Sequence, residues 1–135
     1  MAYASRTGTR RNLDALRAAG WGLLVSAAGV HRTEGFTRYC LDNGAWSAHR
    51  TGMPWDEAAF VRLVEKHGRG ADFIVAPDIV CGGAGSLALS LAWLPRLLAI
   101  APVLIAVQNG MRPADVAHLL GPRVGIFVGG DDEWK

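Results

Sequence analysis

Short apolar runs alternate with helical segments along this sequence, and this alternation limits the fold more than any other feature. Each apolar run has the length of a strand, and most of the segments between them repeat apolar residues with helical spacing. The later runs are apolar almost throughout, which is typical of a parallel sheet covered on both faces. The predicted strands are residues 20–27, 37–46, 71–80, 102–110 and 123–130. The predicted helices are residues 10–19, the second half of 51–70, residues 86–100 and residues 112–121.

Two architectures fit five β/α units. A closed (β/α)₈ barrel needs eight units and typically ~250 residues, whereas an open doubly wound sheet is complete at five strands. A finished open sheet usually has a covering helix after its last strand, but only five residues follow Gly130. We therefore expect a partial TIM-type barrel of about five units, a single domain over residues 1–135, with the open five-strand doubly wound sheet as the alternative. A partial barrel has unpaired strand edges, through which copies of the chain would oligomerise.

Charge and cysteine content narrow the functional class. Half of the 135 residues are hydrophobic, and the formal net charge of +2 is too small to indicate nucleic-acid binding by itself. The two cysteines form no CxxC motif and the N-terminus lacks the apolar run of a signal peptide, so we expect a cytoplasmic protein. Pro95, Arg96 and Pro102 interrupt the apolar stretch 87–107, so we expect no membrane-spanning helix.

Four successive predicted strands end in a polar group or a glycine pair. Asp42 lies at the end of the second strand, Asp78 of the third, Gln108 of the fourth, and Gly129-Gly130 of the fifth. Each motif alone is common in turns and helix caps. The carboxyl ends of parallel strands open onto one face, so the sequence predicts that these residues line one pocket.

This set of side chains suits a nucleobase. A carboxylate accepts two hydrogen bonds side by side, so Asp78 would bind the N–H and amino edge of a guanine-like base. The amide of Gln108 and the backbone N–H groups near the glycine pair would donate to a carbonyl oxygen of the same ring. Asp42 is then available for a second contact or for proton transfer. Trp46 would stack on the base, with a position in the core as the alternative.

The motifs LDNGAW, APDIV, VQNGM and VGG resemble, in the same order, those of the tRNA-guanine transglycosylase family and its relatives that place 7-deazaguanines in DNA. The resemblance covers residues 39–135, and the pattern is closer to the small phage-like relatives. It implies a barrel enzyme that exchanges guanine in DNA or tRNA for a 7-deazaguanine through a covalent aspartate–ribose link. It also implies that Asp42 matches the aspartate of the DSGG-type motif and Asp78 the base-recognising aspartate. Gln108 and Gly129-Gly130 match the glutamine and glycine pair of the later motifs.

The sequence also departs from this family. The family's covalent nucleophile follows a later strand, and its tRNA-acting members have a Cys/His zinc site; this sequence shows neither. DNGAW and QNG stand where DSGG and QGG are usual. The four histidines lack the spacing of metal ligands, so we expect no metal and no cofactor. We therefore expect the chain to bind a purine weakly without turnover.

Basic residues near the termini predict a contact with nucleic acid. Arg6, Arg10 and Arg11 are clustered near the N-terminus, and Lys135 ends the sequence. They would bind backbone phosphates, with a solvated helix face as the alternative.

Two further functions fit the same sequence. One is a barrel lyase or hydrolase of a small metabolite, with Asp42 and Asp78 as acid/base groups or metal ligands. The other is a non-catalytic binding or assembly protein with an open sheet. A barrel by itself implies neither function.

Overall fold

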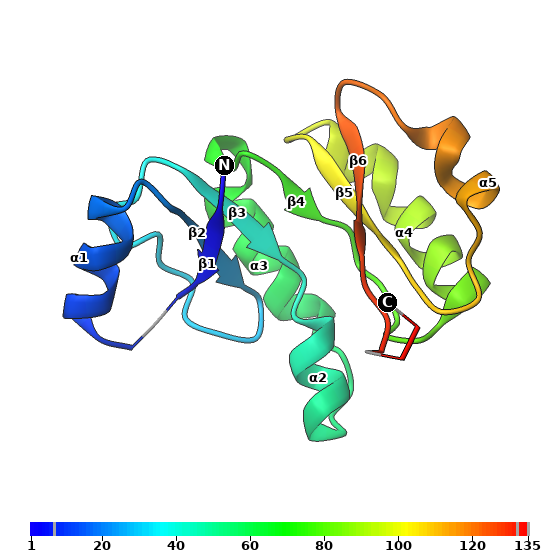
Figure 1. Ribbon diagram of the computed structural model, residues 1–135, viewed down its shortest axis with the longest axis horizontal. Coiled ribbons are helices and arrows are strands. Elements are labelled where there is room, and N and C mark those ends of the chain that lie inside the picture. The colour runs from blue at the N-terminus through cyan, green and yellow to red at the C-terminus, as the bar shows by residue number, and fades with distance from the viewer. Residues whose placement is uncertain (7, 132, 135) are drawn as a thin grey trace.

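Six parallel strands form one open sheet in the computed structural model, which describes residues 1–6, 8–131 and 133–134. The strands lie in sequence order from one edge to the other (Figure 1). They are β1 (Tyr3–Ser5), β2 (Gly22–Ser26), β3 (Tyr39–Asp42), β4 (Ile74–Val75), β5 (Val103–Val107) and β6 (Val124–Val128). The α-helices are α1 (Arg10–Ala18), α2 (Ala45–Thr51), α3 (Glu57–His67), α4 (Gly83–Leu98) and α5 (Pro113–Val116). The α/β class and the parallel sheet are therefore confirmed.

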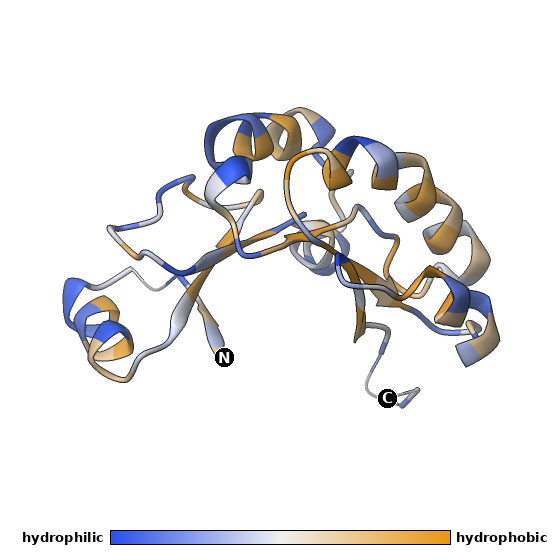
Figure 2. Cartoon of the chain, turned by 90° about the horizontal axis from the view of Figure 1, so that it is seen from above, coloured by the Kyte–Doolittle hydropathy of each residue, from blue (hydrophilic) through white to orange (hydrophobic). Residues whose placement is uncertain are grey.

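The sheet bends into an arch, and helices α1, α3, α4 and α5 lie on its convex side (Figure 2), whereas α2 extends beyond the strand ends (Figure 1). Its strand order shows no reversal, whereas a doubly wound sheet reverses at its switch point. The sheet is open and parallel, as in the alternative prediction, but it has neither the doubly wound order nor five strands. Among the described residues, β1 and β6 are its two edges.

Strand β1 is the sixth strand and was not predicted, because its three residues form no apolar run. It pairs with β2, placing Tyr3 opposite Gly22. The Tyr3 ring lies directly over Gly22, where an added Cβ would be 2.5 Å from the ring. The strand is held further by the Tyr3 hydroxyl, which donates to Asp72 at 2.7 Å.

Helix α4 contains the most apolar part of the sequence. It spans 16 residues with Pro95 inside its last turns. It begins at Gly83, so Ser86 is a buried residue inside the helix, and its hydroxyl accepts the Ile79 N–H at 3.0 Å. Among the described residues, no helix combines the length and the apolar character that a membrane crossing requires.

The main core lies between the sheet and helices α3 and α4. Leu41 and Ile74 on the sheet, Leu63 on α3 and Leu97 on α4 are fully buried in it. Phe60 of α3 is also fully buried, and its ring centroid lies 5.5 Å from that of Trp93 of α4 and 5.8 Å from that of Trp55. These edge-on and tilted aromatic contacts join the two helices beneath the strand ends.

Replacing Phe60 by alanine should lower the free energy of unfolding by about 3–5 kcal/mol, because it leaves a cavity at the centre of this aromatic cluster. Leu120→Ala is the matched control: its side chain is 49% exposed, so the change should stay within about 0.5 kcal/mol. Urea unfolding followed by tryptophan fluorescence measures both. Equal losses in the two variants would contradict the core as described.

Candidate functional site

The predicted pocket residues meet in one cavity at the carboxyl edge of the sheet. This edge cavity has a volume of about 170 Å³. Its lining includes all six residues predicted to bind or act on a base: Asp42, Trp46, Asp78, Gln108, Gly129 and Gly130. Asn43, Val80, Phe127 and Val128 complete the lining. The volume lies below the ~300–1,000 Å³ of pockets for drug-sized ligands, so the edge cavity suits one small heterocycle.

Asp78 is a buried carboxylate at the centre of the site. It follows the short strand β4, and 9% of its surface is exposed. Its Oδ1 accepts from the Asn43 side-chain amide at 2.6 Å, and its Oδ2 accepts from the Gln108 amide. Each carboxylate oxygen has two acceptor positions, so one position on each oxygen has no partner among the described residues.

Burial raises the pKa of Asp78 above its ordinary value, because the charged form loses hydration. The Asn43 and Gln108 amides oppose this rise in pKa by donating to the carboxylate, while the nearby charge of Asp42 adds to it. Desolvation is the largest contribution, so the pKa of Asp78 stays raised despite the two donors.

Gln108 is held in one orientation by its neighbours. It is 1% exposed, and its Oε1 accepts the Cys81 N–H at 3.1 Å. Because Oε1 is fixed in this way, Nε2 points to Asp78 and has a second hydrogen to donate. An added Cβ at Gly129 would lie 2.8 Å from Nε2, so glycine at this position leaves room for the amide. The Gly129 N–H itself donates to the Val107 carbonyl at 2.8 Å, which makes Gln108 the better placed donor to a ligand.

Asp42 lies on the same cavity, at the end of β3. Its Oδ2 accepts from the Ser26 hydroxyl at 2.8 Å and from the Gly44 N–H at 3.0 Å. Its Oδ1 has no hydrogen-bond partner among the described residues. Asp42 is also more exposed than Asp78, so the two carboxylates of the site have different surroundings.

Asn43 belongs to the site, although the sequence did not single it out. It is 2% exposed, and its amide nitrogen donates to both Asp78 and the Ala76 carbonyl. Its Oδ1 accepts the Ala45 N–H at 2.7 Å, which fixes the orientation of the amide. The DNG sequence signals a turn, but it does not show that the asparagine reaches the next strand.

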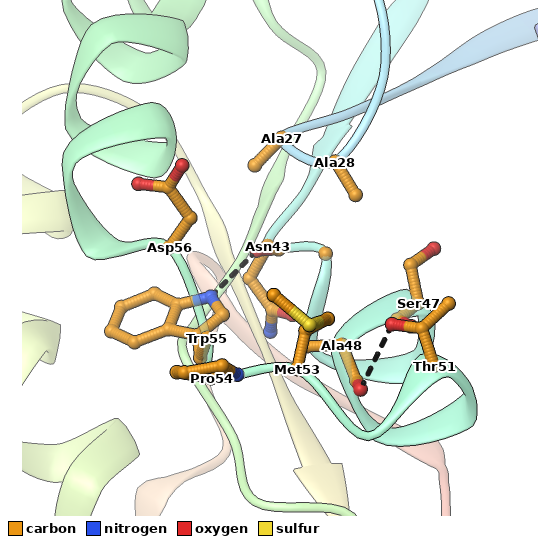
Figure 3. Close-up of a pocket in the computed structure, with 11 residues that line it drawn as sticks. Ala27, Ala28, Asn43, Ser47, Ala48, Thr51, Met53, Pro54, Trp55 and Asp56 are labelled. Carbon is orange, nitrogen blue, oxygen red and sulfur yellow. Dashed lines mark hydrogen bonds between the residues drawn. The ribbon is translucent and has the colours of Figure 1, made fainter.

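A second cavity of about 230 Å³ lies behind Asn43, between α2 and the start of α3 (Figure 3). The Trp55 indole lines this cavity, and its N–H donates to the Asn43 carbonyl at 2.8 Å. The aromatic cluster of the core therefore supports the backbone at the residue that holds Asp78.

Trp46 lies at the rim of the edge cavity rather than in the core. It is on α2, which extends beyond the strand ends in Figure 1, and 56% of its surface is exposed. Its ring centroid lies 5.8 Å from that of His49. An exposed indole at a cavity rim has a free face for stacking.

The predicted nucleic-acid contacts lie apart from the edge cavity. Arg6 directly follows β1 and forms an ion pair with Glu34 at 2.7 Å. Arg10 and Arg11 are exposed in the first turn of α1. Lys135 lies outside the described residues.

The described residues contain no group of three or more His, Cys, Asp and Glu side chains placed to bind a metal ion. Comparison of the chain with known protein families, with curated proteins and with solved structures finds no match. The chemistry of the edge cavity is therefore the main guide to function.

A methyl group at Gly129 should displace the Gln108 amide and with it one donor to Asp78. We expect Gly129→Ala to cost about 1–3 kcal/mol of unfolding free energy. Gly121→Ala is the control, since an added Cβ there meets no atom within 4 Å and should change stability by less than about 0.5 kcal/mol. Urea unfolding and the side-chain amide NMR signals of Gln108 report both effects. An unmoved Gln108 signal in Gly129→Ala would refute the packing described.

Proposed function

We propose that the edge cavity binds a guanine-type base, and that the chain is part of a transglycosylase-like enzyme that exchanges guanine for a 7-deazaguanine in DNA or tRNA. The observation that carries this proposal is the pairing of Asp78 with Gln108 at the cavity. Together they offer an open acceptor beside an open donor. The resemblance of the four strand-end motifs to the transglycosylase family points in the same direction.

Guanine has the complementary edge. Its ring N–H and exocyclic amino group are donors that the open positions of the Asp78 carboxylate accept, and its carbonyl oxygen accepts from the second hydrogen of Gln108. Adenine presents a ring acceptor where guanine has the N–H, and a C–H where guanine has the exocyclic amino group, so it offers the carboxylate no donor. The same edge is present in 7-deazaguanines, whose substitution lies on the five-membered ring. The exposed face of Trp46 would stack on the bound base.

Asp42 suits the second role in base exchange. The leaving base gains a proton on its five-membered ring, and the incoming base loses one. The Asp42 carboxyl group can donate a proton to the leaving base and then, as a carboxylate with an open oxygen, take one up from the incoming base, so the two proton transfers balance. The Ser26 hydroxyl and the Gly44 N–H fix the other oxygen, so the open one keeps a defined direction.

The architecture supports a barrel of the (β/α)₈ type as the parent fold. Sequential parallel strands, a sheet curved in one direction and helices on its convex side are the features of such a barrel (Figure 2). Residues at the carboxyl ends of four neighbouring strands, β3 to β6, line the edge cavity. Barrel enzymes have their active sites at this position.

Calorimetric titration with guanine and with 7-cyano-7-deazaguanine tests the base site. The chain should bind both and should not bind adenine. Asp78→Asn should weaken binding at least about tenfold, because it removes an ionised acceptor. Glu65→Gln, on the exposed face of α3, makes the same chemical change away from the cavity and should leave affinity unchanged. Absence of guanine binding by the folded chain would refute the proposal.

The affinity for guanine should fall as the pH is lowered. The midpoint of this loss should lie at a higher pH than the ordinary pKa of aspartate. The pKa of Asp78 is raised, so its carboxyl takes up a proton earlier as the pH falls, and the protonated form loses acceptor capacity. The folded state also favours the protonated form of Asp78. This contribution to the free energy of unfolding is fully present below the ordinary pKa of aspartate and is lost as the pH rises through the raised pKa. Titrations from neutral to acidic pH measure the midpoint. A midpoint at or below the ordinary pKa of aspartate would contradict this prediction.

A further inference from the structure

A second polar site lies at the same edge of the sheet, beside β1. This arginine hollow has a volume of about 410 Å³ and lies between the residues after β1, helix α1 and the loop after β2. Four arginines and two carboxylates line it: Arg6, Arg10, Arg17, Arg32, Asp14 and Glu34. It shares no lining residue with the edge cavity. Four positive side chains against two negative ones leave the hollow with an excess of positive charge.

Two of the four arginines have carboxylate partners. Arg6 donates from both Nε and Nη2 to Glu34 Oε1, at 2.8 and 2.7 Å, and Arg17 forms an ion pair with Asp14 at 2.6 Å. The Arg10 and Arg32 side chains have no hydrogen-bond or ion-pair partner among the described residues. The hollow therefore has two guanidinium groups available for an anion.

Glu34 already places an anionic group in this hollow. It is one of two non-glycine residues with a positive φ, 51°, among the described residues. The Arg6 hydrogen bond is the largest cause of its lowered pKa, and the charges of Arg32 and Arg17 also lower it. Arg17 donates in addition to the Glu34 main-chain carbonyl. The Glu34 carboxylate thus lies near three guanidinium groups but bonds to one of them.

Helix α1 adds to the positive potential. Its first residue, Arg10, and the preceding Gly8 both line the hollow, and its first turn contains no acidic residue. The Thr9 side chain accepts the Asn12 N–H, and the other N–H groups of the first turn and the helix dipole favour an anion at this position.

We propose that the arginine hollow binds a phosphate group, which replaces the Glu34 carboxylate. A phosphate has more acceptor oxygens than a carboxylate and carries at least equal charge, so it contacts Arg10 and Arg32 as well as Arg6. The planar guanidinium matches phosphate oxygens in pairs. The shared chemistry is a phosphate ester, either in a nucleic-acid backbone or in a small phosphorylated molecule.

The position of the hollow favours the polymer. Three strand spacings separate β1 from β4, roughly 15 Å along the sheet. The phosphate of a nucleotide whose base fills the edge cavity does not reach that far, so one ligand that occupies both sites has several nucleotides. The preference for a polymer rests on the proposed base site, whereas phosphate binding itself does not, because the two sites are built from different residues.

Fluorescence anisotropy with a short labelled oligothymidine tests the hollow, since this probe has no guanine for the edge cavity. The double variant Arg10→Ala/Arg32→Ala should weaken binding about tenfold, and Glu34→Gln should tighten it roughly threefold. The controls are the double variant Arg62→Ala/Arg69→Ala and the single variant Glu65→Gln, which make the same charge changes at exposed positions away from the hollow. The Arg10→Ala/Arg32→Ala variant should bind free guanine as the parent does, because neither arginine lines the edge cavity, so failure of the base site and failure of the hollow are separable.

Competition by thymidine monophosphate identifies the source of the phosphate. Binding of the oligonucleotide alone assigns the hollow to a nucleic-acid backbone, and equal binding of the mononucleotide assigns it to a small phosphate ester. Circular dichroism confirms that each variant is folded. The proposal is overturned if the folded parent binds neither probe, or if the double variant binds as tightly as its control.

Discussion

A buried carboxylate needs hydrogen-bond donors from the protein, and at Asp78 these donors come from the strands on either side. Asn43 follows β3 and Gln108 follows β5, so the carboxylate after β4 joins three neighbouring strand ends. Removing these donors would leave a charge in a nearly dry environment, which costs several kcal/mol. The register of the parallel sheet and the geometry of the edge cavity are therefore linked, because a slip of one strand would remove a donor. Strand β4 has only two residues, so this side-chain bridge adds to a short ladder.

Other residues hold the two amides that donate to Asp78 in position. Gly129 on the far strand leaves space for Gln108, Cys81 holds its Oε1, and Trp55 holds the backbone of Asn43 from the core side. The apolar core and the polar site are thus continuous. Phe60 and Trp93 fix Trp55, and Trp55 fixes the turn that presents the donor to Asp78. A substitution at any of these contacts should therefore change both the free energy of unfolding and the shape of the edge cavity.

The strand-end motifs could be read from the sequence because parallel topology alone brings their residues together. Asp42, Asp78, Gln108 and the glycine pair line one cavity, as predicted, and Trp46 lies at its rim. Strand β1 was missed because an edge strand of three residues needs no apolar run. The role of Asn43 was missed because a DNG turn looks the same whether its amide bonds locally or reaches the next strand. The pairing of Arg6 with Glu34 joins residues 28 positions apart through two loops, and no periodic pattern encodes such a contact.

The two sites at the carboxyl edge treat charge in opposite ways. In the edge cavity, neutral amides surround one buried carboxylate, so the charged form of Asp78 is poorly hydrated. Under our proposal, hydrogen-bond geometry decides which ligand this cavity selects. The arginine hollow has four arginines and two carboxylates, and Arg10 and Arg32 are exposed to solvent. An anion would therefore be attracted over a long range, and its affinity would depend on the salt concentration. A ligand that uses both would be drawn in by its phosphates and selected by its base. This division matches the general separation in nucleic-acid recognition between contacts that position the ligand and contacts that specify it. Under the two proposals together, a polymeric ligand contacts both sites, whereas a free base contacts the edge cavity alone and makes no use of the arginines.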